Sequence, residues 1–118
     1  MTIIGTGVDI IEIERIKKAG KNPRFLSRVF SKEELAYAVK SRKKWERLAV
    51  RFAAKEAVWK ALSSPSVNLR DITVQRLDNG KPILDLSKLG FPKKWKASIT
   101  LSHSDHYAVA YCLVYSES

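Results

Sequence analysis

A long run of helical periodicity between residues 45 and 62 constrains the fold more than any other feature of the chain. Apolar side chains recur there three and four positions apart, through an alanine-rich segment, at Trp45, Leu48, Ala49, Phe52 and Trp59. The following segment, residues 63–68, contains Pro65, which ends the helix. The rest of the chain therefore has to pack around one long helix.

The segments before this helix predict a strand and short helices. Residues 3–11 read as a strand, and residues 12–19 read as a short helix. Ser31, with Glu34 three residues later, has the form of a capping box and predicts a helix that continues through Lys40.

The segments after the long helix predict strands. Short apolar runs alternate there with turn residues near 71–77, 82–86, 96–103 and 107–115. Asn79-Gly80 predicts a hairpin between the first two strands, and Ser104-Asp105-His106 connects the last two. The pattern indicates an α+β chain that forms a single domain over residues 1–118.

Charge and cysteine content narrow the classes of function. The 22 Lys and Arg residues outnumber the 12 Asp and Glu, and the net charge of +10 favours a polyanionic partner: nucleic acid, anionic lipid or an acidic protein. We find no signal-peptide pattern and no apolar stretch of transmembrane length, and so expect a cytoplasmic protein with no membrane partner. Cys112 is the only cysteine, which excludes an internal disulfide and the usual zinc spacing. A chain of this size has a small interior, so a deep cleft forms more readily between subunits.

Asp9 is a carboxylate in an apolar setting. Strand side chains alternate between two faces, and the residues predicted to share the face of Asp9 are Ile3, Gly5, Gly7 and Ile11. A carboxylate on such a face needs hydrogen bonds, a cation or access to solvent, because desolvation is costly. Gly5 and Gly7 remove side-chain bulk, which allows another backbone or a ligand to come close. The alternative is that Asp9 caps the following helix.

Glu56 is the second carboxylate out of place. It stands between Phe52 and Trp59 on the stripe of the long helix that should face the core. The alternative is an ordinary surface ion pair with Lys60, four residues later. If Asp9 and Glu56 meet in the fold, the two carboxylates suit Mg²⁺, whose other positions are filled by water and phosphate oxygens. Lys60 could then neutralise remaining phosphate charge.

Five segments of the chain carry a family resemblance. They are Gly5-Thr-Gly-Val-Asp9-Ile-Ile-Glu-Ile-Glu-Arg15-Ile, Arg24-Phe-Leu-Ser-Arg28-Val-Phe, Arg51-Phe-Ala-Ala-Lys55-Glu56-Ala-Val-Trp-Lys60-Ala-Leu, Asn79-Gly-Lys-Pro82 and Ser102-His103-Ser-Asp-His-Tyr107-Ala-Val-Ala. In this order they resemble the bacterial holo-(acyl-carrier-protein) synthases, the small homotrimeric class of 4′-phosphopantetheinyl transferases. The resemblance implies the fold of that family, with helices packed on a mainly antiparallel sheet around one long helix. Ser63 and Ser64 depart from it, because family members often have glycine after the long helix.

The resemblance implies a reaction and roles for both carboxylates. The reaction transfers the 4′-phosphopantetheine group from coenzyme A to a serine of apo-acyl carrier protein and leaves adenosine 3′,5′-bisphosphate. Asp9 and Glu56 would ligate Mg²⁺, which orients the coenzyme A pyrophosphate. Glu56 would accept the serine proton, directly or through water, and Lys60 would share the charge of the leaving group. The larger members of the superfamily carry a third acid where this chain has Ile11, so water is expected to fill that position.

The resemblance also implies which residues bind the two substrates. Arg51, His103 and Lys60 would contact coenzyme A. From the pattern alone, Arg51 reads equally as a solvated arginine of the helix face and His103 as a satisfied core-edge histidine. A homotrimer with active sites at the subunit interfaces follows from the resemblance in the same way.

The same resemblance also implies what the positive charge of the chain binds. In the resembled family, arginines at the positions of Arg15, Arg24 and Arg28 bind the acidic recognition helix of the carrier protein. The main alternative is a basic nucleic-acid-binding or ribosome-binding domain, but the chain has no glycine-rich phosphate loop, zinc finger or RNP-type strand, so we expect no nucleic-acid partner. A carrier-binding protein without catalysis is the third hypothesis, and the presence of both carboxylates and Lys60 argues against it.

Overall fold

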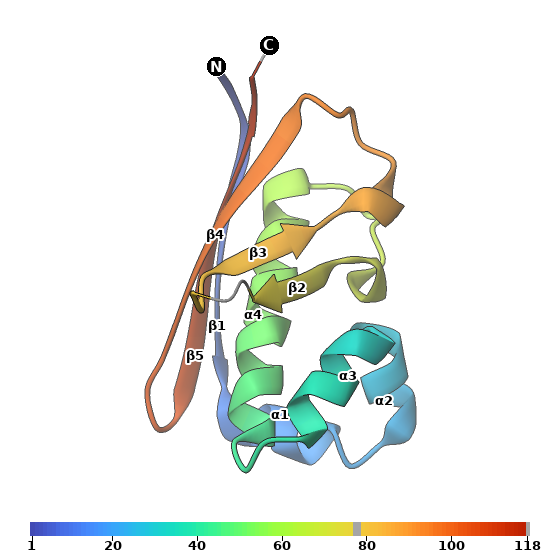
Figure 1. Cartoon of the computed structure of the whole chain (residues 1–118), viewed down its shortest axis with the longest axis vertical. Helices are drawn as coiled ribbons and strands as arrows, with labels where there is room; N and C mark the ends of the chain where they lie inside the picture. The colour runs from blue at the N-terminus through green and yellow to red at the C-terminus, as the bar shows by residue number, and fades with distance from the viewer. Residues whose placement is uncertain (77–78, 118) are drawn as a thin grey trace.

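A long helix lies across one face of an antiparallel sheet, and the shorter helices gather on the same side (Figure 1). The computed structural model describes residues 1–76 and 79–117. In chain order its elements are β1 (Thr2–Glu12), α1 (Ile13–Ala19), α2 (Pro23–Val29), α3 (Lys32–Val39), α4 (Lys44–Leu62), the 3₁₀ turn η1 (Leu69–Asp71), β2 (Thr73–Arg76), β3 (Pro82–Asp85), the 3₁₀ turn η2 (Ser87–Leu89), β4 (Trp95–His103) and β5 (Tyr107–Ser116). The strands form a three-stranded sheet in the order β1-β5-β4 and a two-stranded sheet of β2 and β3. The predicted α+β architecture around one long helix is confirmed.

Two glycines let α4 contact β1 backbone to backbone. A β-carbon on Gly7 would lie 2.8 Å from the Ala57 carbonyl carbon and would overlap the carbonyl oxygen. Gly5 makes the same approach to Ala61, one turn further along α4. The prediction that these glycines admit another backbone is confirmed, because a larger residue would hold the helix off the sheet.

This close approach decides which face of α4 is buried. The residues of α4 buried against the sheet are mainly small: Ala53, Ala54, Ala57, Val58 and Ala61. Trp59 is 37% exposed, so the prediction that it lies on the stripe facing the core is wrong. Two backbones in contact leave no room for a large side chain between them. Glu56 is half-buried, and Phe52 is half-buried against Phe25 of α2.

β1 contains a register shift near its start. The pairing with β5 shifts by one residue between Ile3 and Gly5, which leaves Ile4 as the extra residue of a bulge. Ile3 is consequently 59% exposed, while Ile4 packs against the core. The prediction that Ile3 shares a face with Asp9 is wrong for this reason.

The locally encoded elements occur where the sequence predicts them. The N–H of Glu34 donates to Ser31 Oγ, and the N–H of Ser31 donates to the Glu34 carboxylate, as the capping box requires. β2 and β3 pair antiparallel on either side of Asn79-Gly80, and residues 104–106 connect β4 to β5. The predicted end of the first of these strands, at Leu77, lies outside the described residues.

α4 ends in a conformation that favours glycine. Ser63 follows the helix with φ 51° and ψ 34°, in the left-handed region. Its hydroxyl donates to the Lys60 carbonyl oxygen at 3.0 Å. Glycine adopts this conformation without steric cost, which agrees with the expected departure at this position. Neither α4 nor any other described helix has the length and apolar character needed to cross a membrane.

The sheet face away from α4 carries exposed apolar side chains. We call this surface the outer sheet face and define it by Ile3, Val8, Ile10, Tyr107 and Tyr111, which are 45–64% exposed. Figure 1 shows every helix on the opposite side of the sheet. Apolar patches of this kind on a folded chain mark contact surfaces more often than free surfaces.

Candidate active site

Asp9, Glu56 and Lys60 meet where β1 passes the C-terminal half of α4. The Lys60 ammonium donates to Asp9 Oδ1 at 3.3 Å and to the Val8 carbonyl oxygen at 2.9 Å. The ion pair of Lys60 within the described residues is therefore with Asp9, and the alternative of a Glu56–Lys60 surface pair is wrong. The alternative that Asp9 caps α1 is also wrong, because Glu12 occupies the N-cap position.

The two carboxylates are close enough to affect each other's protonation. Burial raises the pKa of Glu56, the charge of Asp9 raises it further, and Lys60 lowers it. Asp9 Oδ2 is buried and has no hydrogen-bond partner within the described residues. A cation bound here would stabilise both carboxylates. It would pair with the buried Asp9 oxygen, which has no partner within the described residues, and it would favour the ionised form of Glu56.

The donor set distinguishes between kinds of metal. Within residues 1–76 and 79–117, no group of three or more His, Cys, Asp or Glu side chains is arranged to hold a metal ion. A structural or catalytic zinc site normally uses three or four such ligands. Two carboxylates, with solvent and phosphate oxygens in the remaining positions, fit Mg²⁺ instead.

Arg51 lies on another face of α4 and is almost completely buried. It is 2% exposed, its guanidinium stacks on the Tyr37 ring at 4.6 Å, and it donates to the Arg47 carbonyl oxygen at 3.2 Å. Burial lowers the pKa of Arg51, and the nearby Glu34 carboxylate opposes that shift. The alternative of a solvated helix-face arginine is wrong. Five residues separate Arg51 from Glu56, which corresponds to a rotation of about 140° around the helix axis, so the two side chains diverge.

His103 is exposed at the end of β4. It pairs with Ala108 of β5, which in turn pairs with Ile11 of β1. Two strand spacings, about 10 Å, therefore separate the His103 and Ile11 backbones. This exposure argues against a histidine at the edge of the core whose hydrogen bonds are made inside the chain. The strand order also keeps His103 away from β1, the edge of the sheet that carries Asp9.

The three arginines expected to bind the carrier are all exposed. Arg15 belongs to α1, which directly follows β1, while Arg24 and Arg28 lie one turn apart on α2. Within the described residues none of the three forms an ion pair. Their charge is therefore available to a partner.

A buried ion pair beside the site was not predicted. Lys55 Nζ lies 2.6 Å from the Glu34 carboxylate, and both side chains are at most 1% exposed. Lys55 also donates to the carbonyl oxygens of Leu69 and Ile72, and the Val74 N–H donates to Glu34. The pair thus ties α3, η1 and β2 to α4, one residue before Glu56. The capping-box pattern identified Glu34 as a helix-capping residue. The one indication of Lys55 in the sequence is that it is a single lysine in a segment of alanines.

Comparisons with known proteins show similarity over nearly the whole chain. The family model of the 4′-phosphopantetheinyl transferase superfamily matches residues 5–112. A holo-(acyl-carrier-protein) synthase of Clostridium botulinum (strain Eklund 17B / Type B) is 43% identical over 119 residues, covering 95% of this chain and 97% of the relative. The corresponding protein of Aliivibrio salmonicida is 42% identical over 120 residues, with coverages of 93% and 95%.

Solved structures are similar over the same extent. A holo-(acyl-carrier-protein) synthase of Bacillus anthracis, in complex with coenzyme A (3′,5′-ADP), superposes with a TM-score of 0.86 at 34% identity and covers 99% of this chain and 100% of its own. The protein of Helicobacter pylori in complex with coenzyme A gives a TM-score of 0.78 at 28% identity, with coverages of 93% and 99%.

Proposed function

Because the chain belongs to the 4′-phosphopantetheinyl transferase superfamily, we propose that it is a holo-(acyl-carrier-protein) synthase. It transfers the 4′-phosphopantetheine group of coenzyme A to a serine of apo-acyl carrier protein and releases adenosine 3′,5′-bisphosphate. The observation that carries the proposal is the meeting of Asp9, Glu56 and Lys60, where one buried Asp9 oxygen has no partner among the described residues. The cytoplasmic location expected from the sequence belongs to the same proposal.

Asp9 and Glu56 are the residues that would hold Mg²⁺. When bound, it supplies charge stabilisation and orientation for the phosphoryl oxygens of coenzyme A. Asp9 would contribute an oxygen that has no partner within the described residues, and Glu56 a carboxylate whose burial a cation would offset. Lys60 can turn its ammonium from Asp9 towards phosphate, because its side chain is 49% exposed.

Glu56 and Lys60 are proposed to handle the proton and the leaving group. The carrier serine oxygen forms a bond to the β-phosphorus, and the bond between that phosphorus and the bridging oxygen breaks. Glu56 accepts the serine proton, a role for which a carboxylate of raised pKa is better suited than an ordinary one. Lys60 stabilises the negative charge that develops on the departing adenosine 3′,5′-bisphosphate.

Coenzyme A is proposed to bind across two copies of the chain. Of the three residues assigned to coenzyme A, Lys60 lies beside Asp9, whereas Arg51 and His103 diverge from Glu56 within one chain, as their places on α4 and β4 require. A neighbouring copy supplies them to each site if the protein is a homotrimer. The outer sheet face offers the apolar area for such an assembly, with Val8, Ile10 and Tyr111 exposed.

The acidic carrier protein is proposed to bind at α1 and α2. Arg15, Arg24 and Arg28 are exposed and unpaired within the described residues, and the net charge of +10 attracts an acidic partner. Charge reversal at Arg15 should raise the KM for the carrier and leave the KM for coenzyme A nearly unchanged.

The proposed activity is tested by weighing the product. Apo-carrier incubated with the protein, coenzyme A and Mg²⁺ should gain the mass of phosphopantetheine. Asp9→Asn and Glu56→Gln should each abolish the gain, while Glu46→Gln, a matched acid on the same helix, should retain it. No gain with the unaltered chain would refute the activity, and full activity of Glu56→Gln at saturating Mg²⁺ would refute its role as base.

The metal and the assembly are tested by separate measurements. Mg²⁺ should raise the Tm of the unaltered chain and not that of Asp9→Asn. Sedimentation should give three times the mass of one chain, and Tyr111→Glu on the outer sheet face should give a smaller species. A Tm independent of Mg²⁺, or a monomer at micromolar concentration, would contradict these two parts of the proposal.

A further inference from the structure

A cavity of about 550 Å³ lies beyond the end of α4, away from the candidate active site. Its walls come from Leu62 at the end of α4, Leu84 of β3, Leu86, and Trp95 and Ala97 of β4. None of its lining residues is Asp9, Glu56 or Lys60. Pockets that bind small molecules usually measure about 300–1,000 Å³, whereas voids in a packed interior rarely exceed a water molecule.

The floor of the cavity is an apolar surface that the chain leaves half-exposed. The rings of Phe91 and Trp95 stack with centroids 5.1 Å apart and planes 15° apart, an arrangement that stabilises this part of the floor. Leu62, Leu84 and Trp95 pack against the buried core cluster with one side and face the cavity with the other. The core therefore opens to solvent at this point.

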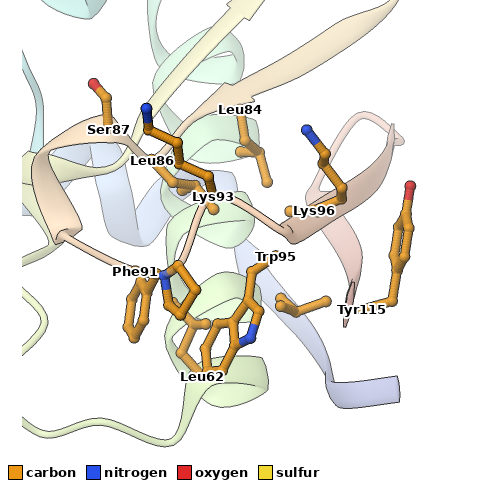
Figure 2. A pocket seen from close by; sticks show the side chains of 12 residues that line it. Leu62, Leu84, Leu86, Ser87, Phe91, Lys93, Trp95, Lys96 and Tyr115 are labelled. Carbon is orange, nitrogen blue, oxygen red and sulfur yellow. The ribbon is translucent and has the colours of Figure 1, made fainter. Parts of the chain in front are cut away.

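Positive charge lies at one side of this apolar surface. Figure 2 shows the ammonium groups of Lys93 and Lys96 on the same side of the cavity, with Phe91, Trp95 and Leu62 on the other. Both lysines are exposed, and in the described part of the chain neither forms an ion pair. A ligand that matches both the apolar surface and the two lysines has a long apolar body and one anionic end.

We propose that this cavity binds a long-chain fatty acid anion. The hydrocarbon chain lies on the Phe91–Trp95 stack and between Leu62 and Leu84, and the carboxylate faces the side of the cavity that carries the ammonium groups of Lys93 and Lys96. Two cations at the edge of an apolar pocket select an anion over a neutral or cationic amphiphile of the same length. The proposal does not depend on the transferase activity, because the cavity shares no residue with that site.

The test is calorimetric titration of the full-length chain with dodecanoate below its micelle concentration. Dodecanoate should bind once per chain. Decanoate, which is shorter by two methylenes, should bind about 15-fold more weakly, since each methylene removed from water strengthens binding about fourfold. 1-Dodecanol should bind about tenfold more weakly than dodecanoate, and dodecyltrimethylammonium more weakly still. Equal affinity for all three head groups would overturn the assignment of the lysines.

Variants locate the bound molecule. The double variant Lys93→Glu, Lys96→Glu should weaken dodecanoate about tenfold or more, and the matched double variant Lys32→Glu, Lys40→Glu should leave it unchanged. Ala97→Phe should abolish binding by filling the cavity. Because the lysine variants are on the surface, they test the proposal even if Ala97→Phe does not fold.

Three outcomes would overturn the proposal. Unchanged dodecanoate affinity in both the Lys93, Lys96 double variant and folded Ala97→Phe would place the ligand elsewhere, for example on the outer sheet face. Displacement by saturating coenzyme A would assign the cavity to the transfer reaction. Dissociation of an oligomer by dodecanoate would show that a second copy of the chain covers the cavity.

Discussion

Gly7→Ala is expected to separate α4 from β1. The added β-carbon would overlap the Ala57 carbonyl oxygen and lie 2.8 Å from its carbon and 2.9 Å from the Ala61 nitrogen. Ordinary contact begins near 3.4 Å, so the helix has to retreat by at least roughly 0.6 Å to clear the Ala57 carbonyl carbon, and further to clear its oxygen. These atoms belong to the backbone, so no rotation of a side chain relieves the overlap.

The retreat should cost about 3 kcal/mol. Overpacking typically costs about 1–3 kcal/mol, and a gap of about 0.5–1 Å forfeits a quarter to a half of the dispersion energy of each opened contact. We place Gly7→Ala at the upper end, because the opened contact runs along the length of α4 and the sheet. Of a total stability of about 5–15 kcal/mol, this is a large share.

Urea unfolding measures the effect through the midpoint at constant m value. Gly90→Ala is the matched control: Gly90 has φ +70°, but no described atom lies within 4 Å of an added β-carbon, so its cost of about 1 kcal/mol is conformational. Ala57→Gly should not rescue Gly7→Ala, because the Ala57 carbonyl remains. A cost for Gly7→Ala no larger than for Gly90→Ala, or a rescue by Ala57→Gly, would refute the backbone contact.

Three other predictions concern buried or half-buried polar groups. Lys55→Met should lower the free energy of unfolding, measured in urea, by about 3–5 kcal/mol, because it leaves the Glu34 carboxylate buried without its cation. Lys60→Met should lower it by less than about 1 kcal/mol, because that ion pair is exposed. Burial and Asp9 raise the pKa of Glu56, so the metal-free folded chain binds that proton more tightly than the unfolded chain and loses stability as pH rises through the folded pKa. Glu56→Gln should therefore be more stable than the unaltered protein at pH 8, with the difference vanishing as pH falls to the ordinary value of 4.5; a constant difference would contradict the shift. Burial raises the pKa of the Cys112 thiol to about 12, so a thiol reagent at pH 8 should label Cys112 only after unfolding, and rapid labelling of the native chain would contradict this.

The sequence was most informative where the determinants are local. The capping box of Ser31 and Glu34, the Asn79-Gly80 hairpin and the periodicity of α4 depend on residues a few positions apart, and each was found where predicted. Gly5 and Gly7 also predicted a close backbone approach, although the sequence did not indicate that α4 makes it.

The errors arose where distant segments decide the outcome. A tryptophan at helical spacing normally faces the core, but contact between α4 and β1 admits only small residues and turns Trp59 outwards. The bulge that exposes Ile3 depends on pairing with β5, more than 100 residues along the chain. Lys55 and Glu34 meet through the packing of α3 on α4, and neither residue type indicates burial by itself.

The contact between Gly7 and Ala57 also limits how the active site can vary. Asp9 lies two residues after Gly7, and Glu56 lies one residue before Ala57. The contact between these two main chains therefore sets how far apart the backbones of the two acids lie. Substitutions elsewhere in the core can lower stability without moving these carboxylates apart. Tolerance to mutation should therefore fall abruptly at Gly5 and Gly7, where a single methyl group changes both the fold and the distance between the proposed metal ligands.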